Sequence, residues 1–287
     1  MAKPPDNIAV SVKARLANIS RATQTPFDIL LIQYVLERIL YRLSISSHRK
    51  NFILKGGMLL AVWIPNDARV TRDLDLLGHG DASEEAVRRI FENLLSIEMN
   101  DGIVFDKNAL RIAPIREEIE YGGLRVKTTA FLERTRVPVV IDIGYGDVVT
   151  PEARDIDYPV LLDLPSPNIR AYPIETVIAE KFHAIVALGM ANSRMKDYYD
   201  LWTLGRVIAH APSALAPAIA ATFARRGAEI PTARAVGLSQ TFASDEVKIR
   251  QWRLYLESLG VEEASLSTVV DLISAYLMPA SIAATKR

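Results

Sequence analysis

Residues 69–78 read RVTRDLDLLG, a sequence typical of a β-strand that places two aspartates only two positions apart. Side chains alternate between the faces of a strand, so Asp73 and Asp75 are expected on one face, together with Thr71 and Leu77. Carboxylates at this spacing lie about 7 Å apart and repel each other unless a cation lies between them. The pair therefore indicates either a divalent metal site or an edge strand with a solvated acidic face.

A glycine pair lies upstream of these aspartates. Gly56 and Gly57 belong to FILKGGMLL, residues 52–60, between a predicted strand and a short predicted helix. Backbone N–H groups exposed at the beginning of a helix bind phosphate well. The pair predicts either a phosphate-binding turn or a tight turn without a ligand.

Asp142 interrupts the apolar run of residues 139–143 within VPVVIDIGYGD. A carboxylate inside a buried strand is costly unless it is paired or binds a metal ion. Two interpretations of Asp142 are therefore open: a metal ligand, or the partner of a neighbouring arginine.

A lysine on the apolar face of a predicted helix is the next candidate. In PIETVIAEKFHAIVALG, residues 173–189, Lys181 falls on the same helical stripe as Val177, Ile178 and Ile185. A bare charge is costly there, so Lys181 is expected either to reach an anion, such as a nucleotide phosphate, or to extend out to solvent. His183 lies off the stripe and is expected at the surface.

The following stretch, NSRMKDYYDLWTL at residues 192–204, places charged residues at helical spacing. Arg194, Asp197 and Asp200 fall on one predicted helix face. The alternative to a functional role is a surface ion pair between Arg194 and Asp197, which would contribute only a few tenths of a kcal/mol, roughly. The nearby aromatic residues are expected to be packing residues; they are Tyr198, Tyr199 and Trp202.

The composition is that of an ordinary soluble globular protein: 49% of the 287 residues are hydrophobic, 24% are charged, and the formal net charge is +0. Any RNA contact must therefore come from local basic clusters. Three clusters are candidates: Lys13 with Arg15, residues 48–50, and Arg225 with Arg226. We see no cysteine, no signal peptide and no apolar run approaching the roughly 20 residues of a membrane span, so a cytoplasmic protein is expected.

Hydrophobic periodicity divides the chain into three predicted domains. Residues 1–48 form an N-terminal helical segment with a basic helix at 11–21 and a long amphipathic helix at 27–43. Residues 49–165 form a core with strands at 52–57, 69–78, 121–133 and 136–147, and a helix at 82–98 capped by Ser83 or Asp81. Residues 151–173 contain five prolines and are expected to be an extended surface connector. Residues 166–287 form a helical C-terminal domain.

Together, these motifs resemble the AbiEii/AbiGii-type nucleotidyltransferase toxins of the DNA polymerase β-like nucleotidyltransferase superfamily. The resemblance covers most of the chain. It implies an α+β fold: a polymerase β-like nucleotidyltransferase core with a mixed β-sheet, an N-terminal helical segment and a mainly helical C-terminal lobe. The motifs that carry it are KGG at 55–57, TRDLD at 71–75, IDIG at 141–144, ETVIAEKF at 175–182 and RMKDYYDL at 194–201.

The resemblance also implies roles for individual residues. The superfamily turn is usually Gly-Ser, whereas the second position here is Gly57, so Thr71 is expected to supply the missing hydroxyl. The implied metal ligands are Asp73, Asp75 and Asp142, which are also catalytic together with Lys181, Asp197 and Asp200. The implied nucleotide-binding residues are Lys55, Gly56, Gly57, Thr71, Lys181, Arg194 and Lys196.

The implied reaction is nucleotidyl transfer, in which a hydroxyl attacks the α-phosphate of an NTP and pyrophosphate leaves. Two Mg²⁺ or Mn²⁺ ions about 3.5–4 Å apart stabilise such a reaction. The expected protein is the toxin of a bacterial toxin–antitoxin or phage-defence system, with an antitoxin encoded adjacently, an RNA acceptor such as the 3′ end of tRNA, and no membrane partner. Two alternatives stay open: an enzyme of this fold that modifies a protein or small hydroxyl compound, and a non-catalytic nucleotide-binding module, which the intact carboxylates disfavour.

Overall fold

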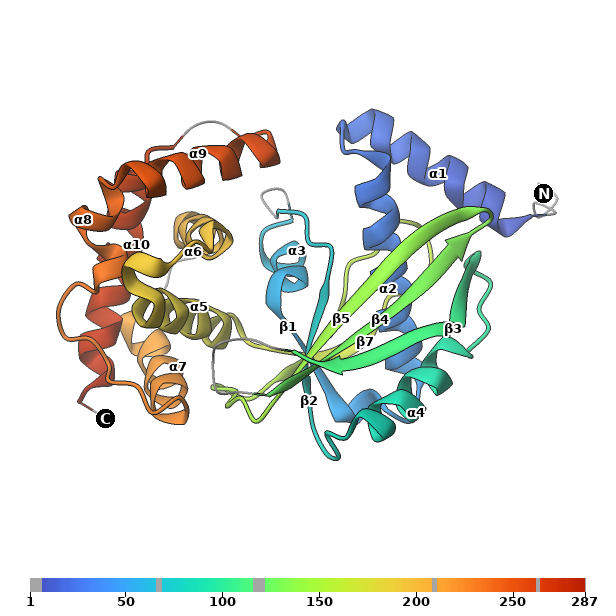
Figure 1. Cartoon of the computed structure of the whole chain (residues 1–287), viewed down its shortest axis with the longest axis horizontal. Helices are drawn as coiled ribbons and strands as arrows, with labels where there is room; N and C mark the ends of the chain where they lie inside the picture. The colour runs from blue at the N-terminus through green and yellow to red at the C-terminus, as the bar shows by residue number, and fades with distance from the viewer. Residues whose placement is uncertain (1–6, 66–68, 116–121, 208–210, 262–263, 287) are drawn as a thin grey trace. The chain divides into compact units, whose positions relative to one another are not determined.

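The computed structural model describes residues 7–65, 69–115, 122–207, 211–261 and 264–286 (Figure 1). The chain forms two compact units, each assembled from stretches that are separate in sequence. The first, the sheet unit, comprises Met1–Trp63, Val70–Gly146 and Arg154–Ala171. The second, the helical unit, comprises Ile64–Arg69, Asp147–Ala153 and Tyr172–Arg287. The division at residues 48 and 165 that periodicity suggests stays a prediction.

A mixed β-sheet forms the centre of the sheet unit. Its strands in the described residues are β1 (Phe52–Lys55), β2 (Leu74–Gly78), β3 (Ile103–Pro114), β4 (Gly123–Leu132), β5 (Thr135–Tyr145), β6 (Arg154–Asp157) and β7 (Asn168–Ala171). They lie in the order β3-β4-β5-β2-β1-β7-β6. The pairs β2–β5 and β1–β7 are parallel, and the other neighbours are antiparallel.

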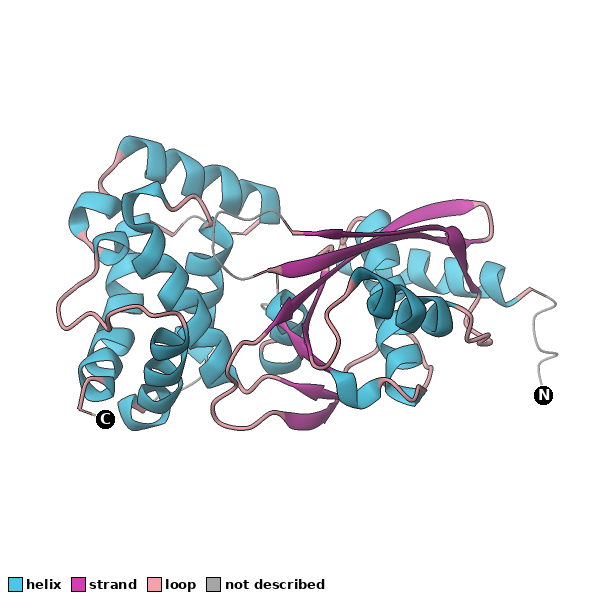
Figure 2. Ribbon diagram, turned by 60° about the horizontal axis from the view of Figure 1, so that its bottom comes forward, coloured by secondary structure: helices cyan, strands magenta, loops and turns pink. Residues whose placement is uncertain are grey.

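Helices cover one face of this sheet. The sheet unit contains α1 (Ile8–Thr23), α2 (Phe27–Ile45), the short α3 (Leu60–Trp63) and α4 (Glu84–Leu95). Helix α2 packs against β5 and β7, and α4 packs against β3. Figure 2 shows helices packed beside the long strands of the sheet. On β4, Val126, Ala130 and Leu132 are fully buried toward this core, as the two-residue period of a strand requires.

Buried charges fasten α2 to its surroundings. Arg42 pairs with Asp101 at 2.6 Å, and both side chains are at most 4% exposed. Glu37 pairs with Arg38 at 2.6 Å and accepts a hydrogen bond from the Leu161 N–H at 2.8 Å. Burial raises the pKa of Glu37 to about 7, because it outweighs the lowering effect of the Arg38 charge. This position on α2 therefore titrates close to neutral pH.

The helical unit contains α5 (Ile174–Leu188), α6 (Met195–Val207), α7 (Pro212–Arg225), α8 (Gln240–Ala243), α9 (Glu246–Leu259) and α10 (Leu266–Ala284). Helix α10 packs against α7 and α6. With 19 residues and a mean hydropathy of 1.5, α10 is long and apolar enough to span a membrane, so the expectation that no stretch approaches this length is wrong. Its Val269, Ile273 and Leu277 are fully buried within the helical unit, which accounts for its apolar composition as a core helix.

Most predicted helices and the four predicted strands are confirmed, although the ends of the strands differ. Helix α2 matches the amphipathic pattern at 27–43, and the Ser83 side chain caps α4 by accepting from the Ala86 N–H. Strand β2 begins at Leu74 rather than at residue 69, because its neighbour β1 ends at Lys55, where the chain turns away at Gly56.

Three strands were not predicted. The expected connector at 151–173 contains the short strands β6 and β7, which pair with each other at one end of the sheet. Strand β3 escapes the pattern because its register shifts between Asp106 and Arg111, which interrupts the alternation of buried and exposed side chains. The predicted strand at 121–133 is confirmed from Gly123 onward, and Tyr121 lies outside the described residues.

Candidate active site

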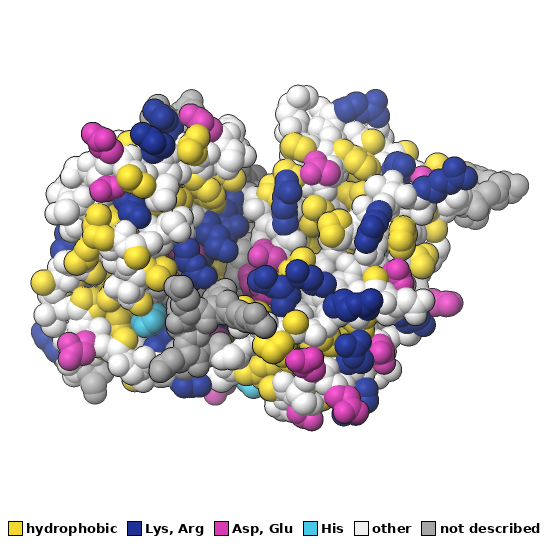
Figure 3. Space-filling model, viewed as in Figure 1, with side chains coloured by type: hydrophobic (Ala, Val, Ile, Leu, Met, Phe, Trp, Pro, Cys, Tyr) yellow, Lys and Arg dark blue, Asp and Glu magenta, His cyan; other side chains and the backbone are white. Residues whose placement is uncertain are grey.

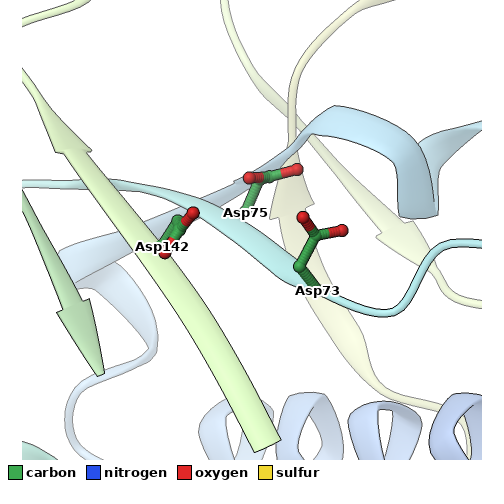
Figure 4. A group of neighbouring side chains, drawn as sticks. All are labelled: Asp73, Asp75 and Asp142. Carbon is green, nitrogen blue, oxygen red and sulfur yellow. The ribbon is translucent and has the colours of Figure 1, made fainter. Parts of the chain in front are cut away.

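Three aspartates from the centre of the sheet meet at one point. Asp75 on β2 lies directly beside Asp142 on β5 in the parallel pairing of these strands, and Asp73 lies just before β2. One carboxylate oxygen of each residue lies within 4.8 Å of those of the other two, and all three side chains are half-buried. Figure 4 shows the carboxylates converging from the two neighbouring segments. The structure thus brings together the three metal ligands predicted from the sequence.

Gly56 makes room for this cluster. It adopts φ +72°, a left-handed conformation that favours glycine, and a Cβ atom built on it would lie 2.0 Å from Oδ2 of Asp75. A side chain at this position would therefore collide with a carboxylate of the site. Gly56 and Gly57 begin a 3-10 helix, Gly56–Leu59, that continues into α3, and Lys55 pairs across the strands with Asp75. The glycine turn predicted as a phosphate site thus lies against the carboxylates.

Thr71 lies outside the strand in which the sequence placed it. It is buried, lies before β2, and its hydroxyl donates a hydrogen bond to Oδ1 of Asp73. The expectation that Thr71, Asp73 and Asp75 share one strand face is wrong, because only Asp75 belongs to the strand. Instead, the Thr71 hydroxyl fixes the orientation of the Asp73 carboxylate.

Of the two interpretations of Asp142 that the sequence left open, the arginine partner is confirmed and the role as a metal ligand stays a prediction. Asp142 belongs to the carboxylate cluster, and it also accepts two hydrogen bonds from Arg125, at 2.7 Å from Nε and 2.6 Å from Nη2. Arg125 lies directly opposite Asp142 on β4 and its side chain is 40% exposed. A planar guanidinium that binds both carboxylate oxygens holds the group in one orientation and neutralises one of the three negative charges.

The donor set suits a hard divalent cation. The cluster offers only carboxylate oxygens, the ligands that Mg²⁺ and Mn²⁺ prefer, and its side chains are half-buried rather than fully enclosed, so water and phosphate oxygens would complete the coordination of a bound ion. Two of the carboxylates come from paired strands and the third is fixed by Thr71, so their mutual distances are set by the fold.

The helical unit contains a second charged cluster, centred on Lys181. Its Nζ lies 2.7 Å from Asp197 and 2.8 Å from Asp200. Arg69 binds both oxygens of Asp200, at 2.7 and 2.9 Å. Burial acts against ionisation of Asp200, but the charges of Lys181 and Arg69 outweigh it and lower the pKa of this carboxyl. Of the two expectations for Lys181, extension to solvent is wrong, because its side chain is only 11% exposed and contacts two carboxylates of α6. A contact with a nucleotide phosphate stays a prediction.

Other residues of the RMKDYYDL motif are dispersed around this cluster. Arg194 lies before α6, half-buried, and its N–H bonds to Asn192, whereas Lys196 is exposed on α6. The idea of a surface pair between Arg194 and Asp197 is wrong, since Asp197 is buried against Lys181. Tyr198 and Tyr199 are buried in the packing of the unit, as predicted.

His183 is not at the surface as expected, but buried, with its ring 5.1 Å from that of Phe223. Burial lowers the pKa of His183 to about 4, and the charge of Arg226 adds to this effect. His183 is therefore a neutral packing residue at neutral pH.

Sequence reasoning missed the two arginines that bind the site carboxylates. Arg125 becomes the partner of Asp142 only through the register of β4 and β5. Arg69 meets Asp200 from 131 positions away in the chain. The only signal available was the general rule that a buried carboxylate needs a partner.

Comparison with known proteins supports this reading of the motifs. Residues 38–274 match the family described as "Nucleotidyl transferase AbiEii toxin, Type IV TA system". A crystal structure of a protein from H. pylori assigned as a nucleotidyltransferase is 16% identical, with a TM-score of 0.54, and the match covers 90% of this chain and 96% of that one. JHP933 from Helicobacter pylori is also 16% identical, with a TM-score of 0.51 and coverage of 90% and 94%. No curated protein matches the sequence.

At this level of identity the two solved structures show a common fold, and the family match carries the assignment. It spans the glycine turn, the carboxylate cluster and the Lys181 cluster. The predicted fold class and the prediction of a nucleotidyltransferase are confirmed, and the family description implies a nucleotide substrate and an antitoxin partner. This chain therefore belongs to the AbiEii family of nucleotidyltransferase toxins of type IV toxin–antitoxin systems.

Proposed function

We propose that this chain is a metal-dependent enzyme that transfers a nucleoside monophosphate from an NTP to an RNA acceptor, such as the 3′ end of tRNA. An antitoxin encoded beside it would counteract the activity, and the NTP requirement places the reaction in the cytoplasm. The observation that supports the proposal most is the cluster of Asp73, Asp75 and Asp142, whose oxygens lie within 4.8 Å of one another beside the Gly56 turn.

The residues of the sheet unit divide the chemistry between them. Asp73, Asp75 and Asp142 would hold Mg²⁺ or Mn²⁺, which when bound stabilises the negative charge on the α-phosphate and on the departing oxygen. Asp142 also orients the acceptor hydroxyl and receives its proton. The hydroxyl oxygen forms a bond to the α-phosphorus, the bond from that phosphorus to the β-bridging oxygen breaks, and the electron pair leaves with pyrophosphate.

The residues proposed to bind the nucleotide are supported either by their position beside the carboxylates or by the family motifs alone. Gly56 and Gly57 present backbone N–H groups beside the carboxylates, and Lys55 lies opposite Asp75, so these residues suit the phosphates. The helical-unit residues rest on the family motifs alone and stay predictions; they are Lys181, Arg194, Lys196, Asp197 and Asp200.

A transfer assay tests the proposal. Purified protein is incubated with each α-labelled NTP in turn, total bacterial RNA and Mg²⁺. We expect label on RNA with wild-type protein and none with Asp73→Asn or Asp75→Asn, since each loses a carboxylate of the cluster. Asp163→Asn is the matched control, because Asp163 is exposed and outside the cluster. Label on protein or on a small hydroxyl compound, with none on RNA, would replace the RNA acceptor by that class.

Metal binding is measured separately by calorimetry. Mn²⁺ titrated into wild-type protein with NTP should bind, and Asp73→Asn and Asp75→Asn should weaken binding strongly because each removes an anionic ligand. Unchanged Mn²⁺ affinity in both variants would rule out the assigned metal site whatever the outcome of the transfer assay.

A further inference from the structure

The three strands β3, β4 and β5 have one face that no helix of the sheet unit covers. Residues of β4 alternate: Val126 and Ala130 are fully buried toward α2 and α4, whereas Arg125 and Lys127 point to the opposite face and are half-exposed or exposed. The residues of that opposite face, here called the open face, are Val104, Asp106, Arg111, Ala113, Arg125, Lys127, Thr129, Phe131, Arg136, Pro138, Val140 and Asp142. The carboxylate of Asp106 is half-buried and accepts hydrogen bonds from the N–H groups of Asn108 and Ala109.

The open face is basic although the whole chain has no net charge. Arg111, Lys127 and Arg136 are exposed on it, and no carboxylate of the described residues forms an ion pair with any of the three. Figure 3 shows lysine and arginine side chains over the sheet unit beside a group of acidic ones. Asp142, at the end of the same face, belongs to the carboxylate cluster.

Two of these cations oppose each other directly. Arg111 on β3 is the cross-strand partner of Lys127 on β4. Like charges at directly opposed positions destabilise a sheet. The Arg111 guanidinium donates hydrogen bonds to the carbonyls of Asn108 and Leu110, which hold it beside its own strand. An anion over the pair would relieve the remaining repulsion, so the pairing favours an anionic ligand on this face.

The basic clusters expected from the sequence are less suited to RNA. Lys13 contacts Glu133 at 3.6 Å, Arg49 pairs with Asp155 at 2.8 Å, and Arg226 pairs with Asp147 at 3.1 Å. Each cluster therefore has at least one charge already balanced by a carboxylate. Arg111, Lys127 and Arg136 of the open face have no such carboxylate partner among the described residues.

We propose that the open face binds the single-stranded 3′ end of the RNA acceptor and leads its terminal hydroxyl to Asp142. Arg136 and Asp142 are six positions apart on β5, which corresponds to about 20 Å of strand. A nucleic-acid strand carries a phosphate about every 3.4 Å where its bases stack and at a wider spacing where they are unstacked, so more than one phosphate lies within reach of the cations. Phe131, Pro138 and Val140 lie between the charges and provide apolar surface for unstacked bases.

This inference rests on the proposed function, and a binding experiment separates the two. Fluorescence anisotropy is measured with full-length protein and a labelled 12-nucleotide single-stranded RNA in 50–300 mM KCl, without NTP. Each phosphate contact to a single strand contributes about 0.7 to the slope of log affinity against log salt. We therefore expect Arg111→Ala, Lys127→Ala and Arg136→Ala each to reduce the slope by about 0.7 and to weaken binding roughly 5-fold at 100 mM salt, and the triple variant roughly 100-fold.

Arg89→Ala is the matched control. Arg89 is 62% exposed on α4, in the same unit, and its loss removes the same charge from a helix that packs on the other face of the sheet. Arg89→Ala should leave the slope unchanged, and Lys127→Arg should retain wild-type binding. Thermal unfolding monitors the fold of each variant.

Two results would overturn the inference. Wild-type RNA affinity in all three open-face variants would show that RNA binds elsewhere, while the transfer assay with α-labelled NTP still decides on the RNA acceptor. Unchanged RNA binding together with lost binding of an acidic partner protein would make the open face a protein-docking surface. Failure of the transfer assay with intact, salt-dependent RNA binding would instead contradict only the proposed reaction.

Discussion

At the scale of single residues, the surroundings of Asp142 explain how a carboxylate is tolerated in this strand. Asp142 sits within an apolar strand, where the sequence suggested either an arginine partner or a metal ion, and the structure provides Arg125 next to two further carboxylates. The guanidinium stabilises the cluster when no cation is present. The same positive charge opposes a divalent cation that approaches Asp142.

The first prediction concerns the repulsion between the Arg125 guanidinium and a divalent cation at Asp142. Arg125→Gln should raise the affinity for Mn²⁺ roughly tenfold, about 1.4 kcal/mol, because it removes a positive charge that competes for Asp142. Calorimetry without nucleotide measures this directly. Lys127→Gln, two positions along β4 with the same change in charge, should have a much smaller effect. Weaker Mn²⁺ binding in Arg125→Gln would mean that the arginine mainly orients the carboxylate for the metal.

The second prediction concerns Lys181. Removing its ammonium group takes a positive partner away from the buried carboxylates Asp197 and Asp200. Lys181→Ala should therefore lower the free energy of unfolding by about 3 kcal/mol. Urea denaturation measures this, with the exposed Lys196→Ala as control. Equal free energies of unfolding for Lys181→Ala and wild type would show that the ion pairs of Lys181 do not stabilise the fold. An increased KM for the NTP in the folded variant would then support the assignment of Lys181 as a nucleotide-binding residue.

At the scale of elements, α2 carries a buried carboxyl group whose charge depends on pH near neutrality. Burial raises the pKa of Glu37 to about 7, above its ordinary value of 4.5. A raised pKa of this kind means that the unfolded chain ionises first as pH increases. The stability contributed by the protonated group is therefore complete below about pH 4.5 and is lost as pH rises through 7.

The third prediction follows. Glu37→Gln should remove most of this loss, which amounts to roughly 3 kcal/mol between pH 4.5 and pH 8. Free energies of unfolding from urea denaturation of both proteins at the two pH values measure the difference. Glu92→Gln, an exposed change on α4, serves as control. Parallel pH profiles of Glu37→Gln and wild type would show that Glu37 is ionised throughout the range.

Elements also show how far the sequence can be interpreted without a structure. Helices α2 and α4 were predictable because amphipathic periodicity and the Ser83 cap are local signals. The three carboxylates could be singled out from local signals: Asp142 because a charge in an apolar run is costly, and Asp73 and Asp75 because two carboxylates two positions apart repel each other unless a cation lies between them. Strands β6 and β7 were not, since four residues each are too few to show a period. The partners Arg125 and Arg69 depend on register and long-range contact, which leave no local trace.

At the scale of the whole molecule, the chain does not divide at one point. Ile64–Arg69 and Asp147–Ala153 belong to the helical unit although strands of the sheet unit precede and follow them. Arg69 lies four positions before Asp73, yet it binds Asp200 in the helical unit. A substitution close to the carboxylate cluster in sequence can therefore destabilise the other unit.

The fourth prediction uses this arrangement. Arg69→Met should accelerate amide hydrogen exchange in α6 roughly 100-fold, because it removes about 3 kcal/mol from a buried ion pair with Asp200. Mass spectrometry of exchanged peptides localises the effect. Arg72→Met, at a 66% exposed arginine three positions later, should leave α6 unchanged. Equal protection of α6 in Arg69→Met and wild type would show that the pair contributes nothing to the helical unit.

The parallel pairing of β2 with β5 also affects the order in which the site is completed during synthesis on the ribosome. Asp75 and Asp142 are neighbours in the sheet but roughly 70 positions apart in the chain. A ribosome that adds about 5–20 residues per second needs roughly 4–14 s to make the intervening stretch. A nascent chain therefore emerges with Asp73 and Asp75 but without Asp142, so the proposed metal site cannot form until the first half of the chain, through the end of β5 at Tyr145, has been synthesised and β5 has paired with β2.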